Sequence, residues 1–184
     1  MIGKFSRIAL ACLAAGAMLG GMSAQAKDVK LTTTDTMIPT GDAGIQLFVR
    51  NKHPVGQTKF APDKILLYVH GATYPSETAF DLPIQGKSMM DLIAARGYDV
   101  YLVDVRGYGR SSRPPEMSQP PGDNKPIVQT RVAAKDFGTA VDYILKKRGV
   151  SKINVMGWSW GTSTVGLYTS ENNAKVNRLV LYAP

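Results

Sequence analysis

The sequence predicts an α/β fold in which a mostly parallel sheet is covered by helices on both faces. Three observations predict it. Short apolar runs alternate with longer segments of helical spacing along most of the chain. The runs at residues 64–69 and 98–103 are apolar almost without interruption, as in strands that are buried on both faces. Helical segments separate successive runs, and such crossovers favour parallel pairing.

The first residues have the features of a secretory signal peptide. Lys4 and Arg7 form a basic start, residues 8–21 form an apolar run, and an Ala-x-Ala pattern then ends at Ala26. The apolar run is short for a membrane span. Two alternatives stay open, namely an uncleaved anchor and a lipoprotein leader modified at Cys12, although the residues before Cys12 are a poor lipidation box.

The expected signal peptide determines the expected domain boundaries and the expected location of the protein. We expect a signal peptide at residues 1–26, with cleavage after Ala26, and one domain at residues 27–184. The protein is then expected to be secreted or periplasmic, with no stable membrane anchor after cleavage.

Composition excludes several classes of function. Cys12 is the only cysteine, so the mature domain has no disulfide, thiolate nucleophile or cysteine metal site. Two isolated histidines, His53 and His70, make a poor ligand set, and we expect no metal and no other cofactor. The net charge is +8, but the basic residues are scattered, and the one tight run at 146–148 suits the end of a predicted helix. No basic stripe is interleaved with aromatic residues, so we expect no nucleic-acid partner.

The N-terminal half begins with an expected antiparallel pair of strands. Residues 29–36 and 45–51 alternate in part between apolar and polar, with a turn around Pro39 and Gly41 between them. The buried strand at 64–69 follows. Residues 87–96 have helical spacing and stop at Gly97, and the strand at 98–103 comes next.

The C-terminal half contains a long loop and two more strand–helix units. Residues 104–122 are rich in Gly, Pro and Ser, which is typical of a loop. A helix is expected over residues 128–148, with Gly149 as its stop. The remaining elements are expected to be a strand at 152–156, a helix from 162 to at least 168, and a strand at 178–182.

The stretch Gly157-Trp158-Ser159-Trp160-Gly161 has the pattern of a nucleophile elbow. A sharp turn from strand to helix needs small residues around a strained central serine. The turn exposes the serine hydroxyl, and the N-terminus of the next helix favours developing negative charge there. The alternative is an ordinary glycine-rich turn. The two tryptophans either line an apolar pocket or pack beneath the elbow.

The segment after residue 69 is the expected second half of an oxyanion hole. Acyl transfer needs two backbone N–H groups near the serine. One comes from the residue after the nucleophile, Trp160, and the other most plausibly from Ala72. For His70 we favour a structural role, in which its ring bonds to nearby backbone, over the role of catalytic base.

The segment after residue 103 is interpreted as a structured loop beside the site. Its glycines, Gly107 and Gly109, do not open a helix, because prolines follow, and this argues against a phosphate-binding loop. Asp104 precedes Ser159, whereas the acid of such a site follows the serine in the chain. We therefore expect Asp104 and Arg106 to hold the loop together.

Taken together, these motifs resemble the α/β-hydrolase fold superfamily over about residues 45–184. Within it, the chain is similar to the serine aminopeptidase and proline iminopeptidase branch. The proline iminopeptidases usually carry H-G-G-P-G where this chain has H-G-A-T-Y, so esterase, aminopeptidase and haloperoxidase-like activities stay open. Dehalogenases and epoxide hydrolases of this fold have an aspartate at the elbow, and Ser159 argues against both. The motifs that carry the resemblance are His70-Gly71, Asp104-x-Arg106-Gly107-x-Gly109-x-Ser111 and Gly157-x-Ser159-x-Gly161.

The resemblance implies a triad of serine, acid and histidine in that order. Both histidines of this sequence precede Ser159, and Glu171 and Asn172 belong to the elbow helix, so no acid is nominated. The chain is therefore expected to be the N-terminal part of an exported serine hydrolase, truncated after the strand that follows the elbow. Its substrates would be small-molecule esters, amides or short peptides. The alternative is a non-catalytic binding protein or an inactive fragment on the same fold.

Overall fold

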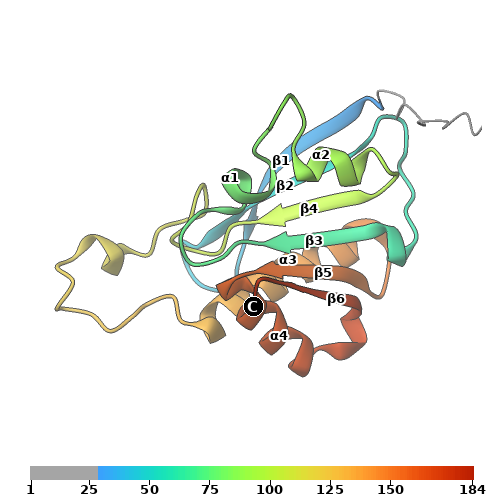
Figure 1. Cartoon of the computed structure of the whole chain (residues 1–184). Coiled ribbons are helices and arrows are strands. Elements are labelled where there is room, and N and C mark those ends of the chain that lie inside the picture. The colour runs from blue at the N-terminus through green and yellow to red at the C-terminus, as the bar shows by residue number, and fades with distance from the viewer. Residues whose placement is uncertain (1–28) are drawn as a thin grey trace, which may run out of the picture.

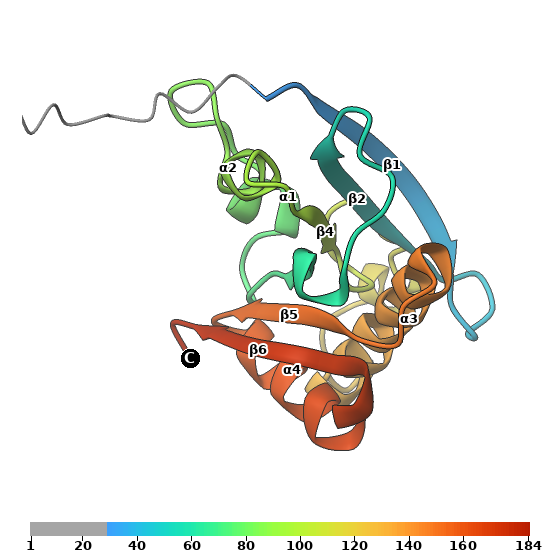
Figure 2. The same cartoon turned by 90° about the vertical axis from the view of Figure 1, so that its right-hand side faces the viewer.

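The computed structural model describes residues 29–184, and the expected signal peptide lies outside the described residues. A six-stranded sheet forms the centre of the domain, with helices on both of its faces (Figures 1 and 2). The strands are β1 (Leu31–Pro39), β2 (Gln46–Pro54), β3 (Ile65–Val69), β4 (Asp99–Val103), β5 (Ile153–Trp158) and β6 (Val176–Tyr182). The helices are α1 (Ser76–Phe80), α2 (Met89–Ala94), α3 (Thr130–Arg148) and α4 (Trp160–Glu171), with short 3-10 turns at Pro62–Lys64, Pro115–Ser118 and Asn173–Lys175.

The strand order is β1-β2-β4-β3-β5-β6. As predicted, β1 and β2 form an antiparallel pair, and β3, β4, β5 and β6 are parallel to one another. Strand β3 lies between β4 and β5, and Val69 at its end pairs with Val103 on one side and Gly157 on the other. The segments that follow these three strands therefore leave the same edge of the sheet next to one another.

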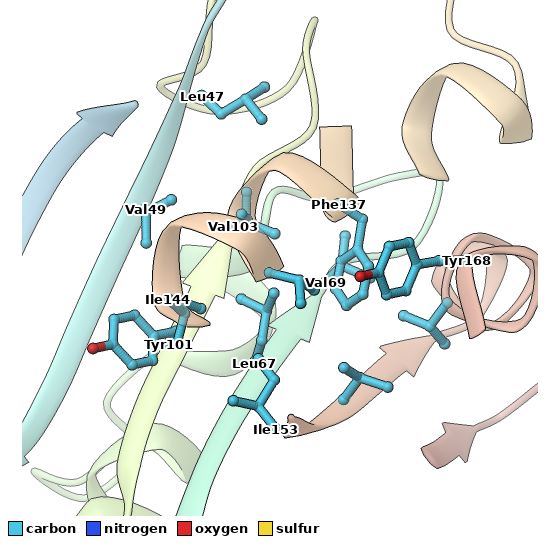
Figure 3. Packing of buried hydrophobic residues seen from close by; sticks show 14 of the residues in the cluster. Leu47, Val49, Leu67, Val69, Tyr101, Val103, Phe137, Ile144, Ile153 and Tyr168 are labelled. Atoms are coloured by element: carbon cyan, nitrogen blue, oxygen red, sulfur yellow. The ribbon is translucent and has the colours of Figure 1, made fainter. Parts of the chain in front are cut away.

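Both faces of the central strands are buried, which explains their continuous apolar runs. In β3, Ile65, Leu67 and Val69 belong to the core beneath α3 and α4, whereas Leu66 and Tyr68 belong to the core beneath α1 and α2. Figure 3 shows the first of these cores, in which the rings of Phe137 and Tyr168 meet edge to face with their centroids 5.3 Å apart.

The helices differ from the predicted ranges mainly at their ends. Helix α3 ends at Gly149 as predicted, because this glycine adopts a left-handed conformation with φ of 66°. Helix α2 is shorter than predicted because the Ser88 side chain caps it in a reciprocal pair with Asp91. Helix α1 was not predicted, since five residues are too few to show a helical period. Within residues 29–184, no helix has the length and apolar character that crossing a membrane requires.

The two edges of the sheet have opposite character. Strand β1 carries three consecutive threonines and an aspartate among its residues. The last four residues of strand β6 are apolar on both faces, yet they are exposed, with 46% of Leu181 and 60% of Tyr182 accessible to solvent. Polar edges resist pairing with other chains, and apolar edges invite it.

Candidate active site

Ser159 lies in the sharp turn between β5 and α4, in a strained backbone conformation. Its φ of 53° and ψ of −123° lie in a region that residues other than glycine rarely adopt. Its amide donates to the carbonyl of Tyr182 at 3.0 Å, and its carbonyl accepts from the Thr162 amide at 2.9 Å. The Ser159 side chain is exposed. Strain of this kind persists only where neighbouring contacts hold it.

The glycines around Ser159 are required by close backbone approach. A Cβ at Gly157 would collide with the carbonyl of Gly161. A Cβ at Gly161 would lie 2.5 Å from the carbonyl oxygen of His70. A Cβ at Gly71 would lie 3.0 Å from the Cβ of Ser159 and 3.2 Å from the carbonyl oxygen of Trp158, which is tighter than an ordinary contact. The end of β3 therefore packs directly against the elbow.

His70 is fully buried, and both of its ring nitrogens have backbone partners. Its Nε2 accepts from the Val105 amide at 3.1 Å, so the ring proton is on Nδ1, which donates to the Gly71 carbonyl at 2.6 Å. Burial lowers the pKa of His70 below its usual value of about 6.5. The neutral ring thus connects the end of β3 to the end of β4.

This contact orients the peptide unit that contains the predicted oxyanion donor. The Gly71 carbonyl and the Ala72 N–H belong to one trans peptide, so they point in opposite directions. Since His70 holds the carbonyl, it also fixes the direction of the Ala72 N–H. The next carbonyl, that of Ala72, accepts from the hydroxyl of Tyr108 at 2.8 Å.

Asp104 is buried at the end of β4 and is bonded to backbone amides. Its Oδ1 accepts from the Ser76 amide at 2.7 Å, and its Oδ2 accepts from the Arg110 amide at 3.2 Å. Burial raises the pKa of Asp104 above its usual range. A Cβ at Gly109, where φ is 50°, would collide with this carboxylate. Asp104 thus fastens the loop after β4 to the start of α1.

Arg106 attaches the same loop to α3. Its guanidinium donates to Asp136 at 2.9 Å and to Asp42 at 2.8 Å, and these bonds raise the pKa of Arg106. Asp136 is not among the site residues expected from the sequence. The signal was present, because Asp136 is an acidic residue on the apolar stripe of α3 that includes Ala133 and Ala140. A charged residue in such a stripe is almost always paired.

A pocket of about 400 Å³ lies beside the elbow. Both predicted oxyanion residues, Ala72 and Trp160, line it together with Tyr108 and Thr130. The indole N–H of Trp160 donates to the Thr130 hydroxyl at 3.1 Å. Trp158 packs on the opposite face of the sheet, against the core of α1 and α2. The two tryptophans therefore differ in role, and Trp160 is the one that lines a pocket.

Neither histidine can accept a proton from Ser159. Both ring nitrogens of His70 are bonded to backbone, and His53 lies far from the elbow. Strand pairing places His53 on β2 opposite Thr32, near the N-terminal ends of the parallel strands, whereas Ser159 lies beyond their C-terminal ends. Glu171, the last residue of α4, pairs with Arg131 at 3.0 Å. Among residues 29–184, no group of three or more metal-ligating side chains is clustered.

Residues 64–184 match the family model described as the alpha/beta hydrolase fold. A probable lipase of Schizosaccharomyces pombe is 29% identical to the chain over 153 residues, which are 80% of this chain and 34% of the lipase. The chain therefore spans about a third of the length of this relative. These matches support the superfamily and do not extend to the serine aminopeptidase branch.

Solved structures show the same fold at low sequence identity. A predicted CIB-like hydrolase from Thermoplasma acidophilum has a TM-score of 0.55 at 19% identity, over 83% of this chain and 63% of its own. An epoxide hydrolase from Vigna radiata has a TM-score of 0.58 at 17% identity, over 81% of this chain and 38% of its own. An epoxide hydrolase from Mycobacterium thermoresistibile has a TM-score of 0.57 at 19% identity, over 82% of this chain and 39% of its own.

Proposed function

Because the chain belongs to the alpha/beta hydrolase fold family, we propose that it is an exported serine hydrolase that cleaves an ester or amide bond through an acyl-enzyme on Ser159. The observation that carries this proposal is the exposed, strained Ser159 beside a pocket lined by Ala72 and Trp160. The likeness to epoxide hydrolases concerns the fold. A serine hydroxyl at the elbow suits attack on a carbonyl carbon.

The proposed reaction uses the backbone around Ser159 to stabilise charge. The Ser159 hydroxyl attacks the carbonyl carbon of the substrate, and the carbonyl oxygen becomes negatively charged. The N–H groups of Ala72 and Trp160 donate to this oxygen. Trp160 is the first residue of α4, where amides have no partner within the helix and the helix dipole favours negative charge. Loss of one such donor typically lowers kcat by about 100- to 1000-fold.

A general base must take the proton of Ser159. His70 cannot serve, because both of its nitrogens have partners, and His53 lies at the other end of the strands. We propose that the histidine and the acid come from polypeptide outside these 184 residues. Without a base a serine hydroxyl is a weak nucleophile, so the 184-residue chain alone should be nearly inactive.

The pocket and the relative favour a small-molecule ester as the substrate. A pocket of about 400 Å³ lies in the range of small-molecule sites. The S. pombe relative is named a probable lipase, which favours an ester over an amide or a short peptide. Export by a signal peptide cleaved after Ala26 is part of the proposal, and mass spectrometry of the secreted protein should find Lys27 as its first residue.

A fluorophosphonate probe tests the proposal. The protein expressed from its complete reading frame should be labelled at Ser159, and Ser159→Ala should abolish the labelling. Ser170→Ala is the matched control, because Ser170 is exposed on the same helix and its hydroxyl donates to the Leu167 carbonyl within that helix at 2.8 Å. It should label like the wild type. Labelling of the isolated 184-residue chain at the same rate would contradict the need for an external base.

A complete protein that is not labelled at all would refute the proposed serine hydrolase. The remaining interpretation would then be a non-catalytic binding protein on this fold.

A further inference from the structure

Tyr108 has a rigid backbone at the turn after β4. It stands between Gly107, with φ of 83°, and Gly109, with φ of 50°. Its amide donates to the Val105 carbonyl at 3.1 Å, and its carbonyl accepts from the Ser111 amide at 3.0 Å. Since both the amide and the carbonyl of Tyr108 are bonded, the direction of its Cα–Cβ bond is fixed.

The side chain of Tyr108 contacts both halves of the predicted oxyanion hole. Its hydroxyl donates to the Ala72 carbonyl at 2.8 Å. Its ring centroid lies 6.3 Å from that of Trp160 and 4.4 Å from that of His70. In the sequence, Tyr108 is a variable position inside the glycine motif, and the motif predicts no role for it.

We propose that Tyr108 is a positioning residue of the oxyanion hole, an inference that rests on the proposed function of Ser159. The Gly71 carbonyl is held by His70 and the Ala72 carbonyl is held by Tyr108, so the peptide units on both sides of the Ala72 Cα are fixed. The ring also lines the same pocket as Ala72 and Trp160. Donors that are fixed before the reaction stabilise the transition state without reorganisation.

Removal of the Tyr108 hydroxyl should therefore impair the chemical step. In Tyr108→Phe the ring contacts remain, while the Ala72 carbonyl loses its donor. The Ala72 N–H is then less well aligned, although His70 still holds its peptide unit. We expect kcat to fall about 10-fold, which is less than the loss of a whole oxyanion donor. KM should stay within about 2-fold, because the interaction acts on the transition state.

The test uses the complete protein with p-nitrophenyl acetate as substrate. Tyr143→Phe is the matched control, because its hydroxyl also has one partner, Lys147 at 3.1 Å, on the exposed face of α3. This control should keep the wild-type kcat and KM. A change in KM alone for Tyr108→Phe would instead assign its hydroxyl to substrate binding and overturn the inference. An unchanged kcat would overturn it as well.

A second measurement separates this inference from the proposed function. The amide ¹⁵N–¹H chemical shift of Ala72 reports its geometry whether or not the protein is active. It should change in Tyr108→Phe and stay unchanged in Tyr143→Phe. Absence of hydrolysis and of fluorophosphonate labelling in the wild type would refute the serine hydrolase. An Ala72 shift that is the same in wild type and Tyr108→Phe would refute the positioning role by itself.

Discussion

Ser159 shows how a single residue depends on the atoms around it. Its left-handed conformation costs on the order of 1–3 kcal/mol, which the bonds to Tyr182 and Thr162 and the tight packing of the elbow glycines offset. The glycines are needed for a steric reason at each position rather than for flexibility. His70 depends on its surroundings in the same way, because its ring connects the ends of two strands only in its neutral form.

Gly157→Ala should destabilise the protein strongly. The new methyl group would collide with the Gly161 carbonyl, and neither backbone can move without opening the elbow. We expect a loss of about 3 kcal/mol or more in the free energy of unfolding, measured by urea denaturation. Gly166→Ala is the control, because a Cβ there meets open space on α4. It should stabilise by about 0.5–1 kcal/mol, and an equal effect of the two changes would contradict the steric argument.

The stability of the protein should fall as the pH drops below about 6.5. The pKa of His70 is lowered in the folded state, so between the folded and unfolded pKa values the unfolded chain binds the extra proton. The contribution of His70 is thus complete above pH 6.5 and decreases below it, by at most about 1.4 kcal/mol per pH unit.

Asp104 interacts electrostatically with His70, and its effect on the pH dependence of stability is opposite to that of His70. Burial raises the pKa of Asp104, so through this group a fall in pH favours the folded state, in which the carboxyl binds a proton more readily than in the unfolded chain. Urea denaturation from pH 8 to pH 5.5, carried out on the wild type and on His70→Asn, separates the effect of the histidine from that of Asp104. In His70→Asn, the fall in the free energy of unfolding below about pH 6.5 should disappear. A fall that persists in this variant would assign the effect to another group.

At the scale of elements, the loop after β4 is the part that joins the two sides of the site. Asp104 fastens it to α1, Arg106 fastens it to α3, and Tyr108 contacts the segment after β3. These bonds span residues that are 28 to 36 positions apart in the chain. The loop thus has the fixed position that a catalytic scaffold requires.

Asp136→Ala should destabilise the protein far more than loss of an exposed ion pair. It leaves the guanidinium of Arg106, a residue only 8% exposed, with Asp42 as its remaining partner. We expect a loss of about 3 kcal/mol in the free energy of unfolding. Glu171→Ala is the control, because it breaks the exposed pair with Arg131 and should cost less than about 1 kcal/mol. Similar values for both, by thermal or urea denaturation, would show that the Arg106 pair has no special weight.

At the scale of the whole molecule, the sheet is protected on one edge and open on the other. Strand β1 presents threonines and ends at Pro39, which hinders pairing with another strand. In the described sheet, strand β6 lies at the edge and pairs with β5 alone (Figure 2). Its residues Leu179, Val180 and Leu181 are exposed. A strand that is apolar on both faces is typical of the interior of a parallel sheet.

The 184-residue chain expressed alone should self-associate through β6. Val180→Lys places a charge on this edge and should lower the association measured by light scattering. Val55→Lys is the control, because Val55 is an exposed valine outside the strands, and it should associate like the parent chain. A monomeric parent chain that unfolds cooperatively would contradict the prediction.

The sequence by itself determined the elements whose signals are local. Strands β3 and β4 were predicted within one residue because burial on both faces leaves a continuous apolar run, and α3 ends at Gly149 because a left-handed residue stops a helix. The order of the motifs also identified the superfamily, and the family model agrees over residues 64–184. The elbow was expected at Ser159 because its glycine spacing is a requirement of the turn itself.

Only the tertiary structure decided which distant residues meet. No local pattern indicated that Asp136 would pair with Arg106, that Tyr108 would hold Ala72, or that Trp158 and Trp160 would lie on opposite faces of the sheet. The contact of Tyr108 with Ala72 depends on the position of β3 beside β4, because the segments after these two strands leave the sheet next to one another. Strand order is a property of the packed chain, because it is set by which apolar faces are buried together rather than by any one segment.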